Sequence, residues 1–115
     1  MNALRVVALC AVLSWSVAQA SDPVDAAVAS SAAVAAAIAS PDRPKADLER
    51  DAVARPTEVL AFLGIVPGMR VADMFSASGY YTELLARTVG VKGGVIAYNN
   101  PPYAKFAEKG IAMRY

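Results

Sequence analysis

The chain has 115 residues and a formal net charge of +1, and its length suits one domain of about 100–150 residues. Although 57% of the residues are hydrophobic, 25 positions are Ala, which buries little apolar area per residue. The Lys and Arg residues are scattered, so the sequence does not predict the basic face that nucleic-acid binding requires. His is absent and Cys10 is the single Cys, which excludes an imidazole base, an internal disulfide and a metal site built from Cys and His.

The first 20 residues have the three parts of a secretory signal peptide. Arg5 provides a basic start, residues 6–13 are an uninterrupted apolar run, and Ala18-Gln19-Ala20 precedes Ser21. Polar residues break the run before it reaches the about 20 apolar residues of a membrane-spanning helix. We therefore expect cleavage before Ser21 and an exported protein, periplasmic or secreted, with no stable membrane span. Lipidation of Cys10 is the alternative.

An Ala-rich spacer of low complexity follows over residues 21–44. Nine of the residues in 26–39 are Ala, and the stretch lacks large side chains that would dock against a core. An isolated helix of this length is marginal in water, so a frayed helix or a linker is expected. Pro41 and Pro44 end any helix, and the folded part is expected to start near Lys45.

Residues 45–115 alternate between helical and extended patterns. The spacing of apolar residues and the turn residues predict helices over 45–55 and 56–63, a strand over 70–75, a helix over 80–89 and a strand over 95–98. Gly64 is placed as the left-handed cap of the second helix. The order strand, loop, helix, strand is a βαβ unit, which makes the expected fold class α/β.

The loop of small residues at 76–79 is the first candidate for chemistry. Small side chains let the backbone and the following helix approach a ligand above the carboxyl end of the strand. Asp73 is a carboxylate near the end of an apolar strand, so it either positions a ligand or caps a neighbouring backbone N–H. Gly79 either belongs to a ligand loop or only makes the turn. The residues alone leave both alternatives open.

A resemblance to a known family enters at this loop. Residues 68–86, GMRVADMFSASGYYTELLA, resemble motif I of class I S-adenosylmethionine-dependent methyltransferases, which has a hydrophobic pair, an acid and a glycine-rich loop that closes on an aromatic residue and a Thr. Residues 56–68, PTEVLAFLGIVPG, resemble the helix and turn that precede motif I in exported, predicted methyltransferases. The similarity spans residues 42–106.

The resemblance implies S-adenosylmethionine as cofactor and a set of residues that would line it. The positions carried over are Asp73, Ser76, Ala77, Ser78 and Gly79 for the methionine and ribose part, and Asn99 for the ribose position of the second strand. The chain departs from the motif in two ways. Phe75 and Ala77 stand where glycines are common, and Asn99 stands where an Asp or Glu normally accepts from both ribose hydroxyls.

The family's fold is a seven-stranded sheet, whereas this sequence predicts two strands. The expectation is an incomplete Rossmann-like fold over residues 45–115, and a truncated methyltransferase-related protein whose intact relatives transfer a methyl group. No catalytic residue and no methyl acceptor are assigned, because the later half of the fold supplies them in this family. The alternative is a non-catalytic exported binding or interaction protein, favoured by the cytoplasmic origin of S-adenosylmethionine. A dinucleotide oxidoreductase fragment is disfavoured because two of three glycines are missing.

Overall fold

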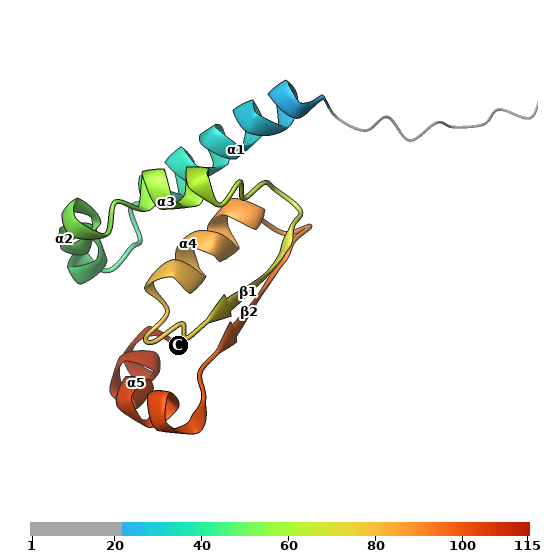
Figure 1. Ribbon diagram of the computed structural model, residues 1–115. Coiled ribbons are helices and arrows are strands. Elements are labelled where there is room, and N and C mark those ends of the chain that lie inside the picture. Colours follow the sequence, from blue (N-terminus) through green and yellow to red (C-terminus); the bar gives the residue numbers. More distant parts are fainter. Residues whose placement is uncertain (1–21) are drawn as a thin grey trace, which may run out of the picture.

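The computed structural model describes residues 22–115, which form a two-stranded parallel sheet with helices before, between and after its strands (Figure 1). In chain order the elements are α1 (Pro23–Ile38), α2 (Lys45–Ala54), α3 (Pro56–Phe62), β1 (Arg70–Met74), α4 (Tyr80–Val89), β2 (Gly94–Tyr98) and α5 (Pro101–Arg114). Helices combined with a parallel sheet agree with the predicted α/β class. The predicted signal peptide, with Cys10 and the cleavage site before Ser21, lies outside the described residues.

The predicted strand-helix-strand unit is formed by β1, α4 and β2. The two strands run parallel, with Met74 opposite Tyr98 at their carboxyl ends. The helix packs on one face of the sheet and buries the apolar stripe Leu84, Leu85 and Val89. Because both strands end at the same edge, the loop after β1 and the residues after β2 become neighbours.

The segment before β1 also follows the prediction. Pro56 lies in the first turn of α3, and Leu60 of this helix is fully buried. Gly64 follows the helix end with a φ of 62°, the left-handed conformation expected of a capping glycine. Arg55, with a φ of 48°, separates α2 from α3. The chain therefore turns sharply at both ends of α3.

The structure differs from the frayed helix or linker expected over residues 21–44, because α1 is a docked helix. It contacts α3 and α4, and it buries Ser30, Val34 and Ala37. The Ser30 hydroxyl donates to the carbonyl of Ile65 at 2.5 Å. Small side chains let the helix approach its neighbours closely, so it docks without large apolar residues. The folded structure thus begins well before α2.

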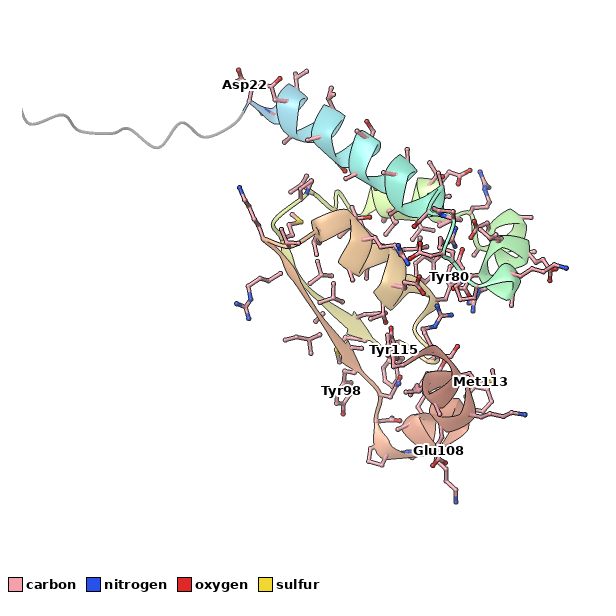
Figure 2. The ribbon with its side chains drawn as sticks, turned by 180° about the vertical axis from the view of Figure 1, so that it is seen from behind. Asp22, Tyr80, Tyr98, Glu108, Met113 and Tyr115 are labelled. Atoms are coloured by element: carbon pink, nitrogen blue, oxygen red, sulfur yellow. The ribbon has the colours of Figure 1, made fainter. Side chains whose placement is uncertain are left out.

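The hydrophobic core lies on one side of the sheet, between α1, α3 and α4. Its buried residues are Val34, Ala37, Leu60, Ile65, Tyr80, Leu84, Leu85 and Val89. Figure 1 shows these three helices on the same side of the strands. On the other face Met74, Ile96 and Tyr98 are exposed, and Figure 2 shows Tyr98 pointing away from α4. Parallel sheets are normally covered on both faces. Within residues 22–115, by contrast, one face of this sheet is left uncovered.

The last helix, α5, is an element that the sequence analysis does not assign. Asn100 is its N-cap, and its side-chain oxygen accepts from the amide of Tyr103 at 3.0 Å. Pro101 and Pro102 occupy the first turn, where a missing N–H costs nothing. An Asn followed by two prolines is a helix-start signal, which makes this helix identifiable in retrospect. No helix in the described part of the chain is both long and apolar enough to cross a membrane.

Candidate functional site

The loop between β1 and α4, residues 75–79, enters the left-handed region at alternate positions. Phe75, Ala77 and Gly79 have φ values of 59°, 51° and 89°. For a residue with a Cβ this region is disfavoured by about 1–2 kcal/mol. Phe75 and Ala77 are the two positions at which the resemblance leads us to expect glycines. The loop backbone therefore has the conformation expected of a glycine-rich loop, although two of its three left-handed residues carry side chains.

The backbone of this loop is tied to the end of β2. The amides of Phe75 and Ser76 both donate to the carbonyl of Tyr98, with N–O distances of 2.8 and 3.2 Å. The amide of Gly79 donates to the carbonyl of Ser76 at 2.9 Å, which closes the turn into α4. These bonds hold the loop at the carboxyl edge of the sheet, where open α/β sheets bind their ligands.

Asp73 lies near the end of β1. The hydroxyl of Thr82, in the first turn of α4, donates to one oxygen of its carboxylate at 2.6 Å. The sequence left open a ligand contact or a backbone cap, and the structure shows a third arrangement, a side-chain bond from helix to strand. A carboxylate has about four acceptor sites, so this bond leaves room for another donor.

Asn99 directly follows β2, and its side chain is directed at the loop. The Oδ1 atom accepts from the amide of Ala77 at 3.0 Å, and the Nδ2 atom donates to the carbonyl of Ala77 at 3.2 Å. The resemblance implies a ribose-binding role for Asn99. In the structure the oxygen and the nitrogen of this amide each make one hydrogen bond to the loop backbone.

The loop also packs against α5. A Cβ added to Gly110 would lie 2.5 Å from the Cβ of Ser78, so helix and loop meet too closely for a larger residue. The Nε atom of Arg114 donates to the carbonyl of Ser78 at 2.7 Å. A Cβ on Gly79 would lie 2.8 Å from the hydroxyl of Tyr115, which Figure 2 places where α5 meets the edge of the sheet. The last turn of α5 thus covers the loop.

Arg114 also connects α5 to α2 and α4. Its guanidinium donates two hydrogen bonds to Asp47, both at 2.8 Å, and another to Glu83. The side chains of Arg114 and Asp47 are only 11% and 9% exposed, so water screens this pair little. The bonds to Asp47 raise the pKa of Arg114 above its already high value. Glu83 pairs in addition with Arg87, one turn further along α4.

Tyr80, at the start of α4, is buried and joins α4 to α2. Its hydroxyl donates to Asp51 at 2.6 Å, and Asp51 accepts two further bonds from Arg43. The guanidinium of Arg50 lies 4.5 Å from the centre of the tyrosine ring. Burial and the bond to Asp51 raise the pKa of Tyr80 above its usual value. These contacts assign Tyr80 to packing rather than to the loop.

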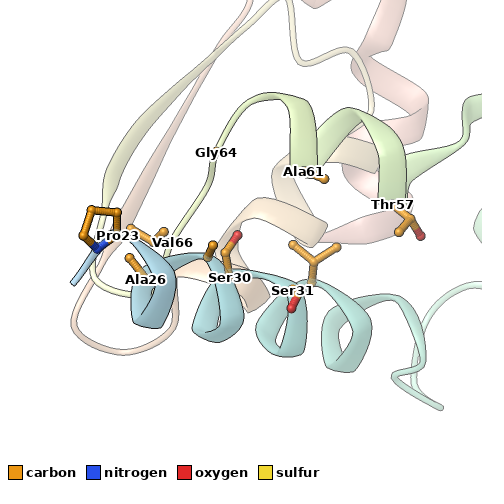
Figure 3. A pocket seen from close by; sticks show the side chains of 10 residues that line it. Pro23, Ala26, Ser30, Ser31, Thr57, Ala61, Gly64 and Val66 are labelled. Carbon is orange, nitrogen blue, oxygen red and sulfur yellow. The ribbon is translucent and has the colours of Figure 1, made fainter. Parts of the chain in front are cut away.

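A groove of about 510 Å³ lies between α1 and α3, away from the loop (Figure 3). Its walls are small or apolar side chains, among them Ala26, Val34 and Ala61, and none of its lining residues is charged. The hydroxyl of Ser30, one of its lining residues, already donates to the backbone carbonyl of Ile65. The groove offers space but few polar groups, so the loop at the carboxyl edge remains the candidate site.

The structure brings the predicted site residues together at one edge of the sheet, and it adds three that the sequence analysis did not select. Thr82, Arg114 and Tyr115 contact Asp73, Ser78 or the surroundings of Gly79. Thr82 lies within the motif and could have been found there, whereas Arg114 is 36 residues from Ser78. Within residues 22–115 no group of three or more Cys, His, Asp or Glu is arranged to hold a metal ion.

Comparisons of the chain with models of protein families, with curated proteins and with solved structures find no match. Two features of this chain itself therefore point to a function: the motif-like sequence over residues 68–86 and the geometry of the loop within it.

Proposed function

We propose that residues 45–115 are the N-terminal portion of a class I S-adenosylmethionine-dependent methyltransferase fold, and that residues 75–79 are its cofactor loop. The observation that carries the proposal is the left-handed backbone at Phe75, Ala77 and Gly79. Strained backbone persists where the surrounding structure enforces it, and it gathers at ligand-binding loops. A simple connection from strand to helix has no need of this strain.

The chemistry of the edge suits the methionine part of S-adenosylmethionine. Small side chains at Ser76, Ala77 and Ser78 allow close approach to the loop backbone. The carboxylate of Asp73 keeps acceptor sites that would bind an ammonium group, because Thr82 occupies only one of them. The proposal concerns cofactor binding, since in this family the methyl acceptor and any catalytic base belong to the later half of the fold.

The second candidate is a non-catalytic binding protein that is exported to the periplasm or beyond and retains part of the fold. The observation that favours it is the contact of α5 with the loop, where Arg114 bonds to Ser78 and Tyr115 lies beside Gly79. A ligand entering above the loop would meet these side chains. The predicted export adds to this case, because S-adenosylmethionine is made in the cytoplasm.

Calorimetric titration of the full chain with S-adenosylhomocysteine tests the proposal. We expect saturable binding weaker than low micromolar, because α5 covers the loop and Asn99 offers no carboxylate to the ribose. Asp73→Asn keeps an oxygen for Thr82 but removes the charge, and it should weaken binding about tenfold or more. Asp25→Asn, at an exposed position of α1, is the matched control and should leave binding unchanged. Absence of binding at millimolar ligand would favour the non-catalytic candidate.

A further inference from the structure

We infer that Asn99 is a positioning residue that holds Ala77 in its left-handed conformation, and that it is not a hydrogen-bond partner of a bound ribose. The first half of the inference concerns the protein without ligand. The second half rests on the proposed function, because it concerns how the cofactor would be recognised.

The geometry of the contact is reciprocal. The side-chain amide of Asn99 accepts from the N–H of Ala77 at 3.0 Å and donates to the carbonyl of the same residue at 3.2 Å. A loop residue has no ladder or helix to satisfy these two groups, and here a side chain satisfies both. The bond to the N–H fixes the peptide unit before Ala77, and the bond to the carbonyl fixes the peptide unit after it. They therefore oppose rotation of its φ out of the left-handed region.

Asn99 completes a set of contacts that starts one residue earlier. The carbonyl of Tyr98 accepts from the amides of Phe75 and Ser76, and Asn99 accepts from the next amide, that of Ala77. The end of β2 thus binds three consecutive N–H groups of the loop. Two of these three residues have positive φ, which a residue with a Cβ adopts only under such constraint.

The chemistry of an amide explains why Asn rather than Asp stands here. An amide both donates and accepts, whereas a carboxylate only accepts. An Asp at position 99 would lose the bond to the Ala77 carbonyl and would place a negative charge beside that oxygen. With Asn at position 99, no carboxylate directly follows β2 to accept hydrogen bonds from both ribose hydroxyls. A ribose bound at Asn99 would have to share the amide with the loop backbone, because Oδ1 and Nδ2 each already make one bond to Ala77.

Hydrogen exchange of the full chain, followed by NMR without ligand, tests the positioning role. Asn99→Ala should accelerate hydrogen exchange of the Ala77 amide about tenfold or more, because this amide loses its hydrogen bond to Asn99. The amides of Leu84 and Leu85 in α4 should keep their exchange rates. Asn100→Ala is the matched control, because its side chain caps Tyr103 instead. It should accelerate Tyr103 and leave Ala77 unchanged. An unchanged Ala77 rate in Asn99→Ala would overturn the inference.

A double-mutant cycle covers the case in which Asn99→Ala loosens the whole domain. Ala77→Gly removes the Cβ that makes the left-handed conformation costly, whereas a loop with Ala at this position can leave that conformation once the Asn99 bonds are lost and so recover the strain. Because this relaxation offsets part of the loss only in the wild-type chain, we expect the drop in Tm caused by Asn99→Ala to be larger in the Ala77→Gly background. Equal drops in both backgrounds would show that Asn99 does not act through the conformation of Ala77.

The ligand arm uses Asn99→Asp and S-adenosylhomocysteine. A ribose-binding role predicts tighter binding, because the carboxylate would accept from both hydroxyls, whereas the positioning role predicts binding that is unchanged or weaker. Tighter binding by about tenfold would overturn the inference and support the proposed function. If neither protein binds the ligand, the proposed function fails, and the exchange experiment alone decides the role of Asn99.

Discussion

At the scale of single residues, two residues with side chains adopt a backbone conformation that would be less strained for glycine. Phe75 and Ala77 each adopt a left-handed φ, at about 1–2 kcal/mol per residue, against a total stability of about 5–15 kcal/mol for a domain. Phe75 has a compensating contact, since its ring lies edge-on to that of Tyr103 at 5.6 Å. The side chain of Ala77 is only a methyl group, so Ala77 is the better position at which to measure the free-energy cost of the left-handed φ.

Ala77→Gly should raise the free energy of unfolding by about 0.5–1 kcal/mol, because relief of the strained φ exceeds the entropy that glycine adds to the unfolded chain. Urea denaturation measures the change. Ala112→Gly, at an exposed position inside α5, is the control with opposite sign and should lower stability by about 1 kcal/mol. Equal losses at both positions would contradict the assigned strain.

At the scale of the elements, α1 shows how a helix of small residues can dock. Its buried positions Ser30, Val34 and Ala37 follow helical spacing, but apolar residues also cover its exposed side. The hydropathy pattern therefore does not indicate which face of this helix is buried. Contact with α3 and α4 selects the face instead, and Ser30 adds a hydrogen bond that only the docked helix can make.

Val34→Ala should lower the free energy of unfolding by about 1–2 kcal/mol, because Val34 is 3% exposed and the change removes two buried methyl groups. Val28 lies in the same helix at 62% exposure, so Val28→Ala should change stability by less than about 0.5 kcal/mol. Thermal or urea denaturation measures both. Similar effects of the two variants would show that α1 is not docked and would restore the linker interpretation.

At the scale of the whole molecule, charged side chains join elements that the hydrophobic core does not. Arg114 links α5 to α2 and α4, while Asp51 joins the segment before α2 to the start of α4 through Arg43 and Tyr80. Hydrogen bonds from Arg43 and then Tyr80 hold the pKa of Asp51 below its usual value. Removal of one partner from such a pair leaves the other charge poorly compensated.

The lowered pKa of Asp51 predicts a loss of stability in acid. A carboxyl group with a depressed pKa in the folded state stabilises the fold above its unfolded pKa, about 3.9, and loses this contribution as the pH falls through the folded value. The difference in Tm between the wild-type chain and Asp51→Asn should therefore be large at pH 6 and shrink below about pH 4. For the exposed control Asp25→Asn the difference should stay small throughout. A wild-type advantage that does not shrink as the pH falls below about 4 would contradict the role of Asp51.

The candidate site was partly predictable. The position of Asp73 and of residues 76–79 at the end of a strand follows from the local pattern, and the structure places them at the carboxyl edge. The partner of Asn99 was not predictable, because Ala77 lies 22 residues away and the contact exists only once the two strands pair. The same holds for Arg114, whose bond to the carbonyl of Ser78 requires α5 to fold back over the loop.

The sequence by itself determined α2, α3, β1, α4 and β2, because proline positions, glycine turns and the spacing of apolar residues act within a few residues of the chain. It also determined the left-handed turn at Gly64. Only the tertiary structure decided that α1 docks, that α5 covers the loop and that Asn99 holds Ala77. These features depend on pairs of residues far apart in the chain, whose contacts form when the sheet and the core bring them together.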